Sequence, residues 1–456
     1  MNAIVSGPTY AEMLEPRQPA PAVAHEMDPA NLFHITWRGA DQRVRHVVLP
    51  KELTGTEANI VVLTGRCFPS GSHKVGPAYA TLLEGELAGE ITPGVHRIIG
   101  PSTGNFGIGV AYIARLKGYA ATVIMPDGMS QERYQRIRQY GGGLDLTPGT
   151  ESDVILVLER TELYKRDPGC KVLAQFELLP NYRFHRYVTG RSALEAAAGY
   201  GNGRVAAFVS APGSAGTLAA GDEIKARFPD AVVCALEPRE CSTLFNNGRG
   251  THRIEGIGDK MVTLIHNVLT TDFVQLIHDD DCVMGLELLE RRSKLLERIL
   301  GLDEGRLAFQ GWFGISSLCN ILGAIRLARY LGLGPEDNVV TIATDGFDRY
   351  PSVLAELARR KGPFSDGMLG GWFESLFRGT DALEILDVRP PEEKERLFGY
   401  KEQVWGGFGY SRAYLERMQA QSFWDAEYQR IGEIDRALVK QRETVPAVAG
   451  AVERIG

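Results

Sequence analysis

The chain has 456 residues, of which 44% are hydrophobic and 23% are charged, and its formal net charge is −7. This length and composition predict a globular protein with a large core and roughly two to three domains. The negative balance and the scattered basic residues argue against nucleic acid as a partner. We expect no membrane partner and a cytoplasmic location, because no uncharged apolar stretch reaches membrane-spanning length and the first residues lack the pattern of a signal peptide.

The six cysteines show no CxxC pair and no spacing typical of metal ligands. This usage favours a reducing compartment, with most of the thiols as small core residues. The histidines do not cluster either, so we expect no metal site.

The predicted elements begin after a lead-in, residues 1–30, that is rich in Pro and Ala. From about residue 60 short β-branched runs alternate with helix-like segments such as 130–139 and 216–227. The runs predicted to be strands are 60–64, 97–100, 122–125, 205–210, 232–236 and 339–344. Buried strands that alternate with helices predict an α/β fold with mostly parallel sheets.

The composition changes after Pro363. Residues 364–410 are rich in Gly and aromatic residues, and residues 411–444 are charged, with apolar residues at helical intervals. We therefore predict a C-terminal extension over 363–456, mostly helical, that ends in an amphipathic helix.

Three glycine-rich loops lie where predicted strands end, which is where ligands collect in open α/β sheets. The first loop, Pro69-Ser70-Gly71-Ser72-His73-Lys74, follows the strand at 60–64. Its lysine could form an imine with an aldehyde cofactor. Taken alone, the same pattern is also typical of an exposed lysine in a turn.

The second loop, Ser102-Thr103-Gly104-Asn105-Phe106-Gly107, follows the strand at 97–100. Hydroxyls and backbone N–H groups at the start of a helix suit a carboxylate. The alternative is a plain helix cap at Ser102 or Thr103, with Asn105 as a turn residue.

The third loop is Gly213-Ser214-Ala215-Gly216-Thr217, between the strand 205–210 and a helix. Small residues allow backbone amides to approach a phosphate, and the helix dipole favours its charge. The loop matches neither GxGxxG nor a Walker motif, so a plain strand-to-helix turn stays open.

Read together and in this order, the loops resemble the fold type II pyridoxal-phosphate enzymes, most closely the cysteine synthase and cystathionine β-synthase group. The resemblance covers roughly residues 60–355. It is supported by the stretches MPDGMSQERYQRIRQYGG (125–142), QFELLPNYRFHRYVTG (175–190), THRIEGIG (251–258) and GWFGISS (311–317).

The resemblance implies a role for each matching residue. Lys74 would be the catalytic lysine that carries pyridoxal 5'-phosphate as a Schiff base and moves the α-proton. The phosphate would lie on Gly213, Ser214, Ala215, Gly216 and Thr217. The substrate carboxylate and amine would meet Ser102, Thr103, Gly104, Asn105, Gln175 and Gly256, and Asn105 would also face the 3'-oxygen of the cofactor.

Three departures from the cysteine synthase pattern affect the details. The sequence Gly-Ser-His-Lys is more similar to tryptophan synthase β chains, which makes His73 a candidate phosphate contact; the alternative is a packed or exposed turn histidine. Phe106 replaces a small hydroxyl residue, which changes the pocket unless the ring only packs.

The third departure is at the strand end that would face the pyridine nitrogen, where cysteine synthases carry a serine. Matching on Arg349-Tyr350 puts Asp345 there. A carboxylate would favour a protonated ring, which is a stronger electron sink. The alternative is that Thr344 makes this contact and Asp345 caps the next turn.

The resemblance predicts β-replacement or α,β-elimination on an amino acid through an aminoacrylate intermediate. Alternatives are an ammonia-lyase or cysteine desulfhydrase-type lyase that releases a 2-oxo acid, and a non-catalytic protein that binds the cofactor. We expect two open, mostly parallel sheets with flanking helices. We also expect a large cofactor domain (1–78 and 180–362), a small mobile domain (79–179) and a homodimer.

Overall fold

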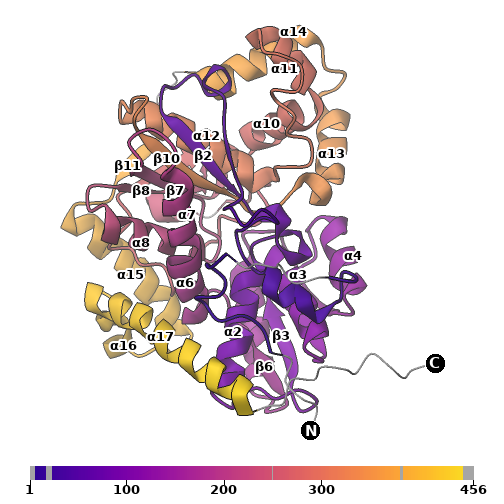
Figure 1. The fold of residues 1–456 in the computed structure, drawn as a ribbon, viewed down its shortest axis with the longest axis vertical. Coiled ribbons are helices and arrows are strands. Elements are labelled where there is room, and N and C mark those ends of the chain that lie inside the picture. The colour runs from indigo at the N-terminus through magenta and orange to yellow at the C-terminus, as the bar shows by residue number, and fades with distance from the viewer. Residues whose placement is uncertain (1–5, 17–22, 249, 380–383, 445–456) are drawn as a thin grey trace.

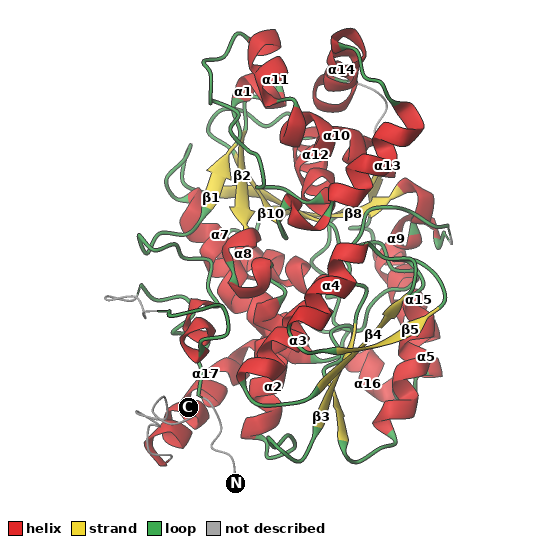
Figure 2. Cartoon of the chain, turned by 90° about the vertical axis from the view of Figure 1, so that its right-hand side faces the viewer, coloured by secondary structure: helices red, strands yellow, loops and turns green. Residues whose placement is uncertain are grey.

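The computed structural model describes residues 6–16, 23–248, 250–379 and 384–444. Within them the chain forms two sheets with helices around both, as Figures 1 and 2 show. In this part of the chain, no helix is both long and apolar enough to cross a membrane. The two-sheet α/β architecture predicted from the sequence is confirmed.

The larger sheet has seven strands in the order β1-β2-β10-β7-β8-β9-β11. The five inner strands are parallel, and the edge strands β1 and β11 run antiparallel to their neighbours. The bounds are β1 (His46–Val48), β2 (Asn59–Thr64), β7 (Val205–Ser210), β8 (Val232–Pro238), β9 (Phe273–Ile277), β10 (Asn338–Ala343) and β11 (Ile385–Asp387).

The smaller sheet has four parallel strands in the order β5-β4-β3-β6. They are β3 (Arg97–Pro101), β4 (Ala121–Pro126), β5 (Gly143–Thr147) and β6 (Cys170–Val172). All six predicted strands are present to within two residues at either end. The sheet draws only on residues 97–172, whereas the larger sheet uses the chain on both sides of that stretch. The domain boundaries themselves, at 79 and 179, stay a prediction.

Helices cover both sheets. They are α1 (Lys51–Thr54), α2 (Val75–Leu87), α3 (Asn105–Leu116), α4 (Gln131–Gln139), α5 (Val154–Lys165), α6 (Leu179–Phe184), α7 (Gly190–Ala197), α8 (Ala219–Arg227), α9 (Thr243–Asn246), α10 (Asp279–Arg291), α11 (Ser293–Leu300), α12 (Ile315–Tyr330), α13 (Pro351–Lys361), α14 (Asp366–Phe373), α15 (Pro391–Gly407), α16 (Arg412–Arg417) and α17 (Gln421–Thr444).

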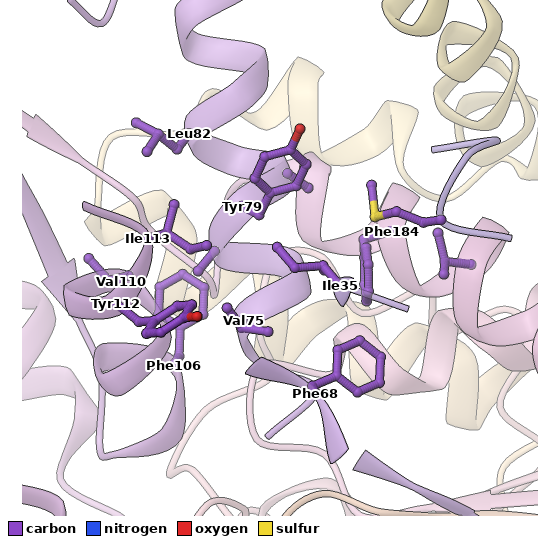
Figure 3. Close-up of a cluster of buried hydrophobic side chains, with 14 of the residues drawn as sticks. Ile35, Phe68, Val75, Tyr79, Leu82, Phe106, Val110, Tyr112, Ile113 and Phe184 are labelled. Atoms are coloured by element: carbon purple, nitrogen blue, oxygen red, sulfur yellow. The ribbon is translucent and has the colours of Figure 1, made fainter. Parts of the chain in front are cut away.

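The core lies on both faces of the larger sheet, because side chains alternate along each strand. In β2, Val61 and Leu63 pack on one side with α2 and α3, and Ile60 and Val62 pack on the other with α10 and α12. Figure 3 shows the centre of the first cluster, where Val75 of α2 lies near Phe106 of α3. This packing fixes the starts of α2 and α3, which follow two of the glycine-rich loops.

The C-terminal extension is helical as predicted, but it is also part of the core. Its strand β11 pairs with β9 at the edge of the larger sheet. Helix α17 lies beside α2 and α6, shown in yellow in Figure 1. Trp405 and Trp424 are fully buried and share a hydrophobic cluster with Val154 and Leu158 of α5. The extension therefore contacts the helices of both sheets.

Candidate active site

Lys74 lies at the end of the loop that leads from β2 into α2, and its side chain points into the protein. It immediately precedes the first residue of α2, and Gly109 of α3 approaches its backbone so closely that a Cβ would lie 3.2 Å from the Lys74 carbonyl oxygen. Only 9% of the residue is exposed, and its Nζ donates a 3.3 Å hydrogen bond to Ser214 Oγ. Burial lowers the pKa of Lys74 to about 8, although Asp259 and Glu151 act to raise it.

One pocket brings most of the predicted residues together. Its lining comes from all three glycine-rich loops and from two further segments: Lys74, Ser102, Thr103, Gly104, Asn105, Phe106, Gln175, Phe176, Gly213, Ser214, Gly256 and Asp259. At most 9% of each of the residues Lys74, Ser102, Asn105 and Gln175 is exposed. Loops that are far apart in the sequence thus enclose one amine, away from bulk water.

The second loop is held by its own hydroxyls. Ser102 Oγ accepts 2.9 Å hydrogen bonds from the backbone N–H groups of Gly104 and Gly107, and the Thr103 hydroxyl donates to Glu151. Ser102 therefore does cap this turn, which was one of the two interpretations of the motif. The groups that the loop leaves free include Asn105 Oδ1, which is buried without a partner.

Asn105 is joined to Asp345, at the carboxyl end of β10. Its Nδ2 donates a 2.6 Å hydrogen bond to Asp345 Oδ2, which also accepts a 2.8 Å bond from the Tyr350 hydroxyl. Asp345 is fully buried and its Oδ1 has no partner. Burial raises the pKa of Asp345, against the effect of Arg349 and Arg133. The Thr344 carbonyl oxygen accepts a 3.4 Å hydrogen bond from the His73 N–H. Which of Thr344 and Asp345 meets the pyridine nitrogen stays a prediction.

The third loop forms a tight cup before α8. Ala215 adopts a left-handed conformation (φ 63°), and Gly213 lies so near the Gly256 carbonyl that a Cβ would come within 2.6 Å. At Gly216 a Cβ would collide with the Asn181 side chain. Thr217 Oγ1 lies 2.8 Å from Ser210 Oγ. Only small residues fit this turn, as a turn that admits a phosphate requires.

His73 is buried beside the cup and does not line the pocket. Its ring stacks on Trp37 at 5.6 Å and meets the edge of His185 at 5.1 Å. Both His73 ring nitrogens and His185 Nε2 are buried without partners. Burial lowers the pKa of both rings far below the ordinary value, so both are neutral. His185, for which the sequence predicted no role, lies 2.8 Å from a Cβ built at Gly216 and so connects His73 to the cup.

Phe106 packs in the hydrophobic cluster between α2 and α3, with 1% of the residue exposed, and also borders the pocket (Figure 3). The ring is thus mainly a core residue. Gln175 lines the pocket as predicted and donates a 3.3 Å hydrogen bond from Nε2 to the Pro101 carbonyl. Gly256 lines it with φ at 99°, a conformation that favours glycine.

Four charged residues near the pocket were missed by sequence reasoning: Asp259, Glu151, Arg133 and Glu255. Asp259 lines the pocket, its Oδ2 is buried without a partner, and burial raises its pKa to about 7. Arg133 lies 2.8 Å from Glu255 and 3.6 Å from Glu151. Burial raises the pKa of Glu151 to about 8, against the effect of Arg133. Arg133 and Glu255 lie in the stretches 125–142 and 251–258, which carry the family resemblance, but that resemblance implied no role for them. Glu151 and Asp259 lie outside those stretches, and their contacts exist only in the folded chain.

The arrangement fits a ligand that carries both a reactive carbonyl and a phosphate. A buried amine with a lowered pKa can attack an aldehyde. Gly213 and Ser214 of the small-residue cup line the same pocket, and so do Asn105 and Asp259, whose Oδ1 and Oδ2 atoms, respectively, are buried without partners. Native proteins rarely bury so many unpaired polar atoms at one place unless a ligand or water satisfies them. These features are those expected of an α/β enzyme whose ligand is a phosphorylated aldehyde.

Comparison with known proteins identifies that class. Residues 51–345 match the family model described as pyridoxal-phosphate dependent enzyme, and the chain belongs to this family. A cysteine synthase from Staphylococcus aureus (strain Mu50 / ATCC 700699) is 33% identical over 285 residues, which are 62% of this chain and 84% of that protein. The cofactor predicted from the sequence, pyridoxal 5'-phosphate, and the suspected family are confirmed.

Solved structures of related enzymes have a similar fold. A hydrogen sulfide-producing enzyme from Fusobacterium nucleatum has a TM-score of 0.58 at 26% identity and covers 67% of this chain and 96% of its own. The structure of O-ureido-L-serine synthase has a TM-score of 0.61 at 25% identity and covers 77% of this chain and all of its own. The whole C-terminal extension, residues 363–456, lies beyond the family match, which ends at residue 345.

Proposed function

We propose that this enzyme catalyses pyridoxal-phosphate-dependent β-replacement on an amino acid, with a chemistry similar to that of cysteine synthase. The observation that carries the proposal is the pocket that Lys74 shares with the loop 102–105, Gln175 and the start of the cup, Gly213 and Ser214, with the Lys74 amine hydrogen-bonded to Ser214. The similarity to a cysteine synthase and to O-ureido-L-serine synthase supports it.

The residues would hold the cofactor at three places. Lys74 would bond to its aldehyde carbon, the cup from Gly213 to Thr217 would bind its phosphate, with His73 as a further contact, and Asn105 and Asp345 would contact its ring. When bound, pyridoxal phosphate supplies an electron-withdrawing ring that stabilises negative charge on the α-carbon of an amino acid.

The chain itself would bind the substrate and move the proton. Backbone groups of the loop 102–105, together with Gln175, would bind the carboxylate of the amino acid. The Lys74 amine, once displaced, would take the α-proton and later return it. Because the pocket is buried, water is kept away from the reacting atoms.

Elimination is a second candidate, and Asp345 favours it. A carboxylate beside the pyridine nitrogen would keep that nitrogen protonated and so help a poor leaving group depart. An assay of pyruvate release against thioether or thiol formation tests the two reactions. It would use O-acetylserine, O-phosphoserine, serine, cysteine and diaminopropionate. Replacement products from O-acetylserine in excess of pyruvate would support the first; pyruvate alone from every substrate would overturn it.

A cytoplasmic location and a homodimer belong to the same proposal. All six cysteines are free in the structure, which supports a reducing compartment. Dimerisation is carried over from the family resemblance, and the molecular mass in solution measures it.

A further inference from the structure

The segment 262–271 lies directly behind the cup. Thr263 Oγ1 donates a 2.9 Å hydrogen bond to the Ser214 carbonyl, so the segment contacts the backbone of the cup itself. Val262, Thr263 and His266 line a small cavity together with Gly213 and Ala215. The segment has no helix or strand of its own, so its backbone carbonyls need partners from elsewhere.

The C-terminal extension supplies those partners from α15. Trp405 Nε1 donates to the Val262 carbonyl at 2.9 Å. Lys401 Nζ donates to the carbonyls of Leu264 at 3.0 Å and His266 at 2.5 Å. Two of the three accepting carbonyls, those of Val262 and Leu264, flank Thr263, the residue that bonds to Ser214. Helix α15 therefore bonds to the segment 262–271 through its carbonyls, and the same segment bonds to the cup through Thr263.

Lys401 is an unusual residue for such a position. It is 1% exposed, and among the described residues no carboxylate lies within ion-pair distance of its amine. Its amine lies 5.5 Å from the ring centres of Phe398 and of Trp424. Burial lowers the pKa of Lys401 to about 7. Burying an amine is costly unless its donors are used, and here the partners are carbonyls of the segment 262–271.

We propose that Lys401 and Trp405 are positioning residues of the phosphate cup, acting through the segment 262–266 and its Thr263–Ser214 hydrogen bond. The proposal rests on the proposed function only in assigning the cofactor phosphate to this cup. Both residues lie outside the matched family region, which ends at residue 345. The extension would thus contribute to cofactor binding without touching the cofactor.

The test compares two ligands that differ only in the phosphate. Dissociation constants of pyridoxal phosphate and of pyridoxal are measured on the cofactor-free full chain, in wild type, Lys401→Met and Trp405→Phe. Because Lys401→Met removes a buried donor of two hydrogen bonds to the segment, it should weaken the binding of pyridoxal phosphate about tenfold and leave the binding of pyridoxal nearly unchanged. Trp405→Phe, which keeps one aromatic ring and loses the indole N–H donor, is predicted to weaken the binding of pyridoxal phosphate by about threefold.

Lys440→Met is the matched control, because Lys440 is an exposed lysine of α17. It should change neither constant. If Lys401→Met raises the dissociation constants of both ligands equally, or leaves that of pyridoxal phosphate unchanged, the positioning role is overturned. If Lys401→Met does not fold, the same comparison is made with Trp405→Phe. A wild-type chain that binds no pyridoxal phosphate would instead overturn the proposed function, and the positioning role with it.

Discussion

Asn105 and Asp345 lie 240 positions apart in the sequence, yet the Asn105 amide donates a 2.6 Å hydrogen bond to the Asp345 carboxylate. One residue begins α3 and the other follows β10, so the bond joins the second glycine-rich loop to the larger sheet. Tyr350 and Arg349 complete the surroundings of the carboxylate. Asp345 is therefore a fixed, buried acid at the place where the family resemblance puts the pyridine nitrogen.

The first prediction concerns this carboxylate. Asp345→Ser removes the charge that would keep the ring protonated, so turnover of serine, which has a poor leaving group, should fall at least about tenfold more than turnover of O-acetylserine. Steady-state rates on the two substrates measure the difference. Equal losses on both substrates would show that Asp345 does not assist the leaving group.

The second prediction concerns pH. Burial lowers the pKa of Lys74 to about 8, so the neutral amine that attacks an aldehyde becomes the main form above that pH. The rate at which the cofactor-free enzyme captures pyridoxal phosphate should rise about tenfold per pH unit below 8 and level off above it. Stopped-flow absorbance between pH 6.5 and 9.5 follows the imine. A rate that still rises steeply at pH 9.5 would contradict the lowered pKa.

The third prediction links Lys74 to Asp259. The Asp259 carboxylate raises the pKa of Lys74 by charge pairing, and Lys74 lowers the pKa of Asp259. Asp259→Asn keeps the shape and removes the charge, so the pH midpoint of cofactor capture should move below 8. The same stopped-flow series measures the midpoint. An unchanged midpoint would mean that Asp259 does not act on the amine.

The fourth prediction tests the shape of the cup. In Gly216→Ala the new Cβ would collide with the Asn181 side chain and come within 2.8 Å of the His185 ring. Affinity for pyridoxal phosphate should therefore fall about tenfold or more. Gly199→Ala is the control, because no atom lies within 4 Å of the added Cβ. Titration of both variants measures the contrast, and equal affinities would contradict the assignment of the cup.

Much of the fold could be predicted from the sequence, because buried parallel strands are short β-branched runs. Most of the missed strands lack that pattern, and β9 has it except for one polar residue. Residues 143–147 (β5) begin with Gly and carry Asp145 on a half-exposed edge, and β9 contains the buried Gln275. β1, β6 and β11 have three residues each, too few to show a period.

The site residues also differ in how far the sequence could predict them. Lys74, the loop 102–105 and the cup 213–217 are local motifs, so the sequence could predict them. One pocket brings together Lys74, the loop and the first two residues of the cup, Gly213 and Ser214. Asp259, Arg133 and His185 belong to the site only through tertiary contacts, and no spacing marks them. The contribution of the extension to the core was hidden for the same reason.

The most direct measurement is chemical trapping of the cofactor. Borohydride reduction of the pyridoxal-phosphate-loaded enzyme, followed by proteolysis and peptide mapping, should place a stable pyridoxyl group on Lys74 alone. Lys74→Ala should carry no such group and lose the imine absorbance. A pyridoxyl group on a different lysine, or none at all in the wild-type protein, would contradict the account.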